Sequence, residues 1–224
     1  MVAVFQRTGH RRYAVEVHRQ VFPDLEMKPA PGYDQLIPHD LMHMVVEAQL
    51  GLNRGVFGQL AAGGDAGTFH PIFTHNETTR EIARVRTHVK ERGKKLLREG
   101  RDDCARSERA TYICWQYWLS TSQSADLKAI SRSMAQQAKE VRDVATAKEL
   151  SALNQSKLAE ICKHLDALSS QWSSLAVGQS IAVRWPDLAV ATDPAVLMNA
   201  GSLINDALHD HLEAPTERKN DEPL

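Results

Sequence analysis

Alternating apolar and polar positions open the chain and predict a β-hairpin. Val2 and Val4 alternate with other residues, a turn follows around Gly9, and residues 13–18 alternate again. Period-two alternation on both sides of a glycine indicates two paired strands. The segment 177–186 alternates in the same way, and the hairpin is its only evident partner. We therefore expect a small antiparallel sheet that joins both ends of the chain.

Apolar positions at helical spacing dominate the rest of the chain. They predict helices at 38–50, 77–98, 105–119, 125–148, 153–175 and 194–212, and a short segment rich in small residues at 56–62. The fold class is therefore α+β, mainly α-helical: one helical domain at 1–212 with a small antiparallel sheet. The charged tail at 213–224 is expected to be disordered.

Composition limits the classes of function. The chain has 224 residues, with 27 Lys and Arg against 28 Asp and Glu and a net charge of −1, which disfavours a dedicated nucleic-acid binder. No run of residues is apolar for long enough to span a bilayer, and no signal peptide is evident. The three cysteines fit neither a disulfide framework nor a paired zinc motif, so we expect a cytoplasmic protein.

The first predicted helix carries the most specific chemical pattern. His39, His43 and Glu47 follow one another at four-residue spacing, with Asp40 beside them. Residues four apart lie on the same helix face, and imidazole and carboxylate groups are ligands for zinc, iron or manganese. We therefore predict a divalent metal cofactor, zinc in the first place, bound by His39, Asp40, His43 and Glu47.

One helix cannot supply all these ligands to a single ion. His39 and Glu47 are about 12 Å apart along the axis, whereas zinc bonds are about 2 Å long. One pair four residues apart would bind, and Asp40, Gln59, Asp65, His70 or His75 are candidates to complete the site. An unbound carboxylate would orient a histidine or act as a general base toward a metal-bound water. The competing interpretation is that these polar residues are structural.

Part of this region resembles a known family. His39-Asp40-Leu41-Met42-His43, followed by 55–61, is similar to the metal motif of the coenzyme Q biosynthesis protein described as the fourth in that pathway. The resemblance implies a helical protein that binds a divalent metal through His39, Asp40 and His43. The chain departs at the fourth ligand, where Gln59 replaces glutamate after a longer spacing. The block from 29 to 69 also resembles a group of bacterial proteins of unknown function, which implies shared architecture alone.

Two functions remain open at this stage. The first is a metal-dependent hydrolase or lyase that acts on a small organic substrate. The second is a non-enzymatic interaction protein that forms homo-oligomers through the long helices at 125–175, with the motif serving a structural role. The basic run at 84–98 is interpreted as a solvated helix face, because glutamates interrupt it. The glycine-rich segment 63–67 lacks the spacing of a phosphate-binding loop.

Overall fold

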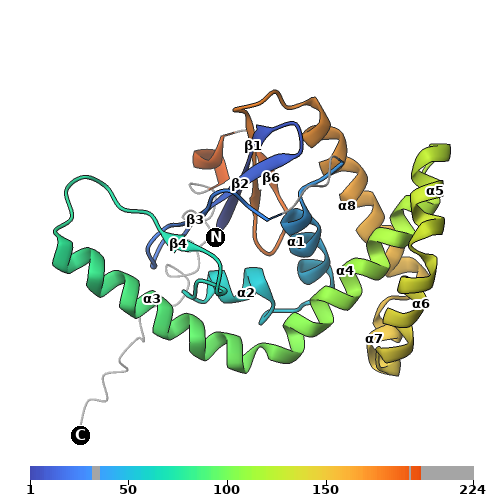
Figure 1. The fold of residues 1–224 in the computed structure, drawn as a ribbon, viewed down its shortest axis with the longest axis horizontal. Helices are drawn as coiled ribbons and strands as arrows, with labels where there is room; N and C mark the ends of the chain where they lie inside the picture. The colour runs from blue at the N-terminus through green and yellow to red at the C-terminus, as the bar shows by residue number, and fades with distance from the viewer. Residues whose placement is uncertain (32–35, 192, 198–224) are drawn as a thin grey trace, which may run out of the picture.

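The computed structural model describes residues 1–31, 36–191 and 193–197, and they form an α+β fold that is mainly α-helical (Figure 1). The strands are β1 (Val2–Gly9), β2 (Arg12–His18), β3 (Leu25–Met27), β4 (His70–Pro71), β5 (Ser180–Arg184) and β6 (Val190–Ala191). The helices are α1 (His39–Leu50), α2 (Val56–Ala61), α3 (Thr79–Glu99), α4 (Arg101–Thr121), α5 (Ala125–Ser133), α6 (Ala135–Val144), α7 (Ala147–Ala152) and α8 (Gln155–Ser174).

The strands form one antiparallel sheet in the order β4-β3-β2-β1-β5-β6. The predicted hairpin is confirmed, since Val4 pairs with Glu16 and Phe5 with Val15. The predicted late strand is confirmed as well, because Phe5 also pairs with Ile181. The sequence pattern missed the short strands β3, β4 and β6, which are too brief to show an alternation of their own.

One face of the sheet forms the core with α1, α2 and α8. Phe5, Val15 and Ile181 are almost completely buried there, and the tyrosine ring of Tyr13 meets Trp172 of α8 edge to face. The α4 helix crosses α1 on the side away from the sheet, and α5, α6 and α7 form a further layer beyond α4 (Figure 1). This layering buries the middle of α1, residues 41–47, on all sides.

The predicted single helix at 125–148 is wrong, because the chain forms three shorter helices there. The break near Ser133 coincides with a bond from its hydroxyl to the carbonyl of Ile130. At the second break Ala145 is extended, and Thr146 and Glu149 form a capping box that begins α7. The predicted helix at 153–175 is confirmed as α8.

Two sequence predictions extend beyond the described residues. Most of the helix expected at 194–212 and all of the tail at 213–224 lie outside them. Within the described part of the chain, no helix is both long enough and apolar enough to cross a membrane.

Candidate functional site

The polar stripe of α1 is enclosed by other elements. His43 is 4% exposed and Glu47 is 0% exposed, whereas His39 and Asp40 in the first turn are half-buried. The stripe is covered because α4 packs directly against this side of α1 (Figure 1). Buried polar groups need hydrogen-bond partners, so the contacts of each side chain indicate its role.

Glu47 holds the beginning of α2. Its Oε1 accepts a hydrogen bond from the backbone N–H of Val56 and its Oε2 accepts one from Phe57, both at 2.9 Å. These N–H groups have no partner within α2, so the carboxylate caps the helix from the preceding helix α1. Gly55 makes this approach feasible, because a Cβ there would lie 2.4 Å from the Glu47 carboxyl carbon.

Ser107 of α4 connects Glu47 to His43. Its hydroxyl donates to Oε1 of Glu47 at 2.8 Å and lies 2.8 Å from Nδ1 of His43. Burial raises the pKa of Glu47 to about 7, although the hydrogen bonds from Ser107 and the α2 backbone oppose the shift. With its proton directed to Glu47, the Ser107 oxygen can accept a hydrogen bond from Nδ1–H of His43.

These contacts leave the other nitrogen of His43 for a ligand. The hydroxyl of Thr111 also lies 3.3 Å from Nδ1, while Nε2 is 3.7 Å from Oε2 of Glu108. Burial lowers the pKa of His43 to about 3, and the nearby His39 adds to this effect. His43 is therefore neutral at physiological pH, and this hydrogen-bond arrangement exposes the lone pair of Nε2 toward Glu108.

His39 and Asp40 lie in different surroundings. The His39 and His43 rings meet edge to face with centroids 4.6 Å apart, so these two residues are brought together as predicted. Asp40 instead accepts a hydrogen bond of 2.5 Å from the hydroxyl of Tyr13 in the sheet. Burial raises the pKa of Asp40, and burial together with the charge of Asp40 raises the pKa of Tyr13. Asp40 therefore connects α1 to the sheet.

The other proposed ligands lie elsewhere. Gln59 donates to the carbonyl oxygen of Arg54 and to Sγ of Cys104, and its buried Oε1 has no partner. Asp65 accepts a hydrogen bond from the Gly67 N–H, His70 lies in β4, and His75 is exposed before α3. No interaction within the described ranges joins any of them to His39 or His43.

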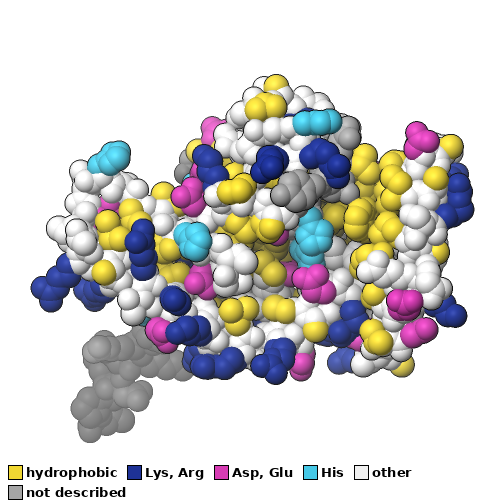
Figure 2. Space-filling view, in the orientation of Figure 1, with side chains coloured by type: hydrophobic (Ala, Val, Ile, Leu, Met, Phe, Trp, Pro, Cys, Tyr) yellow, Lys and Arg dark blue, Asp and Glu magenta, His cyan; other side chains and the backbone are white. Residues whose placement is uncertain are grey.

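Glu108 is the acidic neighbour that sequence reasoning missed. It lies 65 positions after His43 in an unremarkable charged stretch, and only the crossing of α1 and α4 brings it close. Its side chain is 71% exposed, so this end of the cluster is open to solvent. Figure 2 shows histidine and acidic side chains next to each other over this crossing. Among the described residues, no three His, Cys, Asp or Glu side chains are arranged to hold a metal ion.

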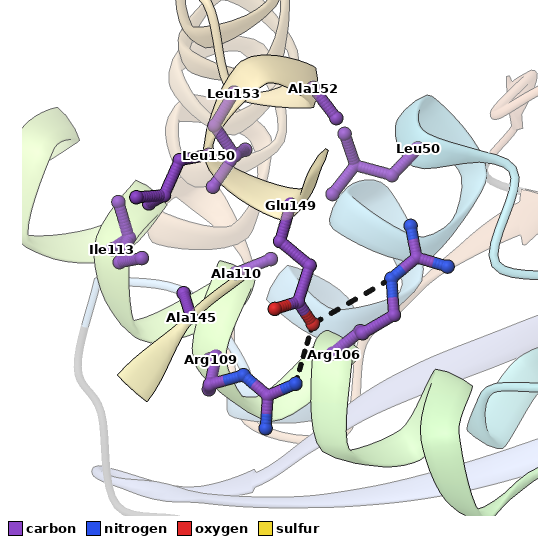
Figure 3. A pocket seen from close by; sticks show the side chains of 10 residues that line it. All are labelled: Leu50, Arg106, Arg109, Ala110, Ile113, Ala145, Glu149, Leu150, Ala152 and Leu153. Carbon is purple, nitrogen blue, oxygen red and sulfur yellow. Dashed lines mark hydrogen bonds and ion pairs between the residues drawn. The ribbon is translucent and has the colours of Figure 1, made fainter. Parts of the chain in front are cut away.

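A small cavity between α4 and α7 is too small to be a ligand site (Figure 3). Glu149 of α7 points inward there and accepts a hydrogen bond of 2.5 Å from Arg109, with Arg106 at 3.8 Å. The remaining lining is largely apolar, from Leu50, Ile113, Leu150 and Leu153. Its cavity volume of about 10 Å³ is barely room for one water molecule. The ion pairs therefore fasten α7 to α4.

Comparison with known proteins adds no relative. Scans of protein-family models, of curated proteins and of solved structures give no match to this chain. The resemblance of residues 38–62 to the coenzyme Q biosynthesis family therefore stays a prediction.

Proposed function

We propose that this protein binds a divalent metal ion through His39 and His43 of α1, with Glu108 of α4 as the acidic partner. The observation that carries the proposal is the 3.7 Å separation between Nε2 of His43 and Oε2 of Glu108. Two donors bound at about 2.1 Å in tetrahedral geometry lie roughly 3.4 Å apart. The separation is therefore close to what zinc requires, and iron and manganese are the alternatives.

The surroundings of His43 support a ligand role. A metal-binding imidazole must be neutral, and burial keeps His43 neutral. Ligand histidines usually have the second ring nitrogen fixed by a hydrogen bond, as Ser107 and Thr111 fix Nδ1 here. The ring of His39 stands beside His43, and a rotation of this half-buried side chain would supply a third ligand.

The two carboxylates of the α1 motif have supporting roles in this proposal. Glu47 orients His43 through Ser107, and Asp40 fixes the first turn of α1 to Tyr13. A bound ion would supply Lewis-acid chemistry or an activated water, which suits a hydrolase or lyase reaction on a small organic substrate. The three cysteines are all free, which supports a cytoplasmic location.

The alternative function is a non-enzymatic interaction protein. Its original basis, a pair of long helices, is reduced because residues 125–148 form three short ones. What favours it now is the exposure of Ile130, Val144 and Leu150 on the outer helix layer, at 45%, 71% and 39%. Light scattering tests this alternative: a self-associating protein that Val144→Ser converts to a monomer would favour it.

The metal proposal is tested by elemental mass spectrometry of protein purified without a histidine tag. We expect near-stoichiometric metal in the parent after incubation with zinc. A titration with zinc, followed by the same measurement, should show at least tenfold weaker binding in His39→Ala and Glu108→Gln. Both side chains reach the surface, so these variants should remain folded. His75→Ala is the matched control, because it removes an exposed histidine far from α1.

Circular dichroism of each variant separates loss of metal from loss of structure. A folded parent that takes up no zinc, iron or manganese would overturn the proposal. Metal binding that survives in both His39→Ala and Glu108→Gln would assign the ion to another site.

A further inference from the structure

A cleft lies between α3 and the segment 65–71, away from the α1 and α4 crossing. It has a volume of about 520 Å³, within the range that small-molecule sites occupy. Its lining comes from Asp65, Gly67, Phe69, His70, Pro71, Arg86, Val89, Lys90, Lys94 and Leu97. None of these residues belongs to the proposed metal site.

The charged wall of this cleft is formed by α3. Arg86, Lys90 and Lys94 are spaced four residues apart, so their side chains follow one stripe on successive turns. Basic side chains cover α3 in Figure 2, with apolar side chains between them and the sheet. His70 contributes an imidazole from the facing strand β4. The cleft therefore presents several nitrogen donors to its interior.

Neighbouring side chains neutralise only part of the positive charge of these three residues. Lys94 forms a 2.7 Å ion pair with Glu91, and the guanidinium of Arg86 lies 5.2 Å from the centre of the Phe73 ring. Lys90 is in no ion pair within the residues that the structure describes. The one acidic lining residue, Asp65, directs Oδ1 to the N–H of Gly67. An excess of positive charge thus remains.

The floor of the cleft is apolar. Phe69 and Val89 lie behind this floor and are each 2% exposed, so the apolar surface open to a ligand comes mainly from Leu97, which is 37% exposed, and half-buried Pro71. Inorganic phosphate would use the cations but leave this surface wet. A ligand with an apolar portion would cover it and gain free energy from the buried area.

We propose that this cleft binds a small organic anion, a phosphate or carboxylate group attached to an apolar body. The anionic group would lie against Arg86, Lys90 and Lys94, and the apolar body against Leu97 and Pro71. Such binding requires no metal ion, so it can be measured in the presence of a chelator and is independent of the proposed metal site.

The probe is octyl phosphate below its micelle concentration, titrated into the full-length protein and followed by calorimetry. We expect saturable binding, at least tenfold weaker binding of inorganic phosphate, and none of neutral octyl glucoside. Octanoate tests the carboxylate arm, and tighter binding of one of the two octyl anions identifies the preferred group. Equal affinity for octyl phosphate and octyl glucoside would overturn the proposal, because the cations would then have no role.

Substitutions locate the binding. Lys90→Gln and Arg86→Gln should each weaken the binding of octyl phosphate about threefold to tenfold, because each removes one charged donor. Lys95→Gln is the matched control: it makes the same change in charge on the same helix, at a side chain that is 68% exposed and outside the cleft. Leu97→Ser should weaken the binding of octyl phosphate and leave the binding of inorganic phosphate unchanged. If Lys90→Gln and Lys95→Gln have the same effect, the proposed location is wrong.

Discussion

The imidazole of His43 shows how a single residue acquires its chemistry from its neighbours. Two hydroxyl groups from α4 face Nδ1, and the carboxylate of Glu108 faces Nε2. The pKa of His43 is lowered mainly because burial removes the water that would stabilise a charged ring. The same burial that suits a metal ligand also makes the folded protein sensitive to acid.

This sensitivity can be measured as stability against pH. In the unfolded chain His43 has its ordinary pKa of 6.5, whereas in the folded protein its pKa is about 3. The contribution of His43 to the free energy of unfolding is therefore constant above pH 6.5. Below pH 6.5 the free energy of unfolding falls as the pH decreases toward 3. The slope for one group is at most about 1.4 kcal/mol per pH unit.

We expect His43→Gln to be less stable than the parent at pH 7.5, with a difference that narrows as the pH falls to 5. Urea unfolding at several pH values, with a chelator present, measures both proteins. Comparison of the two removes the opposing effect of Glu47, whose raised pKa lowers stability as pH rises from 4.5 to about 7. Parallel stability curves would show that His43 can take up its proton in the folded state.

At the scale of elements, α2 is a six-residue helix that its own propensity cannot stabilise. A buried ionisable side chain holds each end. Glu47 accepts from the first N–H groups of α2. Nη1 of Arg19 donates to the carbonyl oxygen of Leu60 in the last turn and to that of Gly64 just after the helix. When Glu47 is ionised, as it is at pH 8, the two charges match the helix dipole, negative at the beginning and positive at the end.

We expect Glu47→Gln to destabilise the protein by about 1–3 kcal/mol, because the amide NH₂ group replaces one of two acceptors that face buried N–H groups. Urea unfolding at pH 8 provides the measurement. Glu160→Gln makes the same change at a side chain that is 53% exposed and paired with Lys157, and should cost clearly less than Glu47→Gln. Equal costs in the two variants would mean that the Glu47 contacts contribute nothing specific.

At the scale of the whole molecule, the sheet, the central helices and α4 enclose one main core. Cys114 of α4 and Cys162 of α8 lie in this core at 0% and 9% exposure, whereas Cys104 is only half-buried. Burial raises the pKa of Cys114 to about 12 and of Cys162 to about 11. The thiolate is the reactive form, so both groups are protected while the core is closed.

Thiol labelling therefore reports global unfolding. We expect a chromogenic disulfide reagent at pH 8 to react with at most one thiol in the native protein and with three in urea. Cys104→Ser should remove the native reaction and leave two thiols in urea. Rapid reaction of three thiols without denaturant would show that α4 and α8 separate readily from the rest of the core.

The sequence by itself determined the elements whose signals are local. Alternation around Gly9 predicted the hairpin, helical spacing predicted α1 and α8, and the hairpin was the only evident partner for the strand at 177–186. These features depend on neighbouring residues, so a pattern along the chain contains them. It also identified His39 and His43 as a pair, since helical spacing alone places them together.

Only the tertiary structure decided what those residues contact. The α1 helix is apolar on both sides of its polar stripe, so the sequence could not say that α4 would cover His43 and Glu47. Ser107 and Glu108 lie 60 or more positions after His43 and Glu47, and Glu47 finds its partners in α2 because Gly55 leaves space for it. Contacts between distant segments depend on how helices pack, and residue spacing along one helix does not encode that packing.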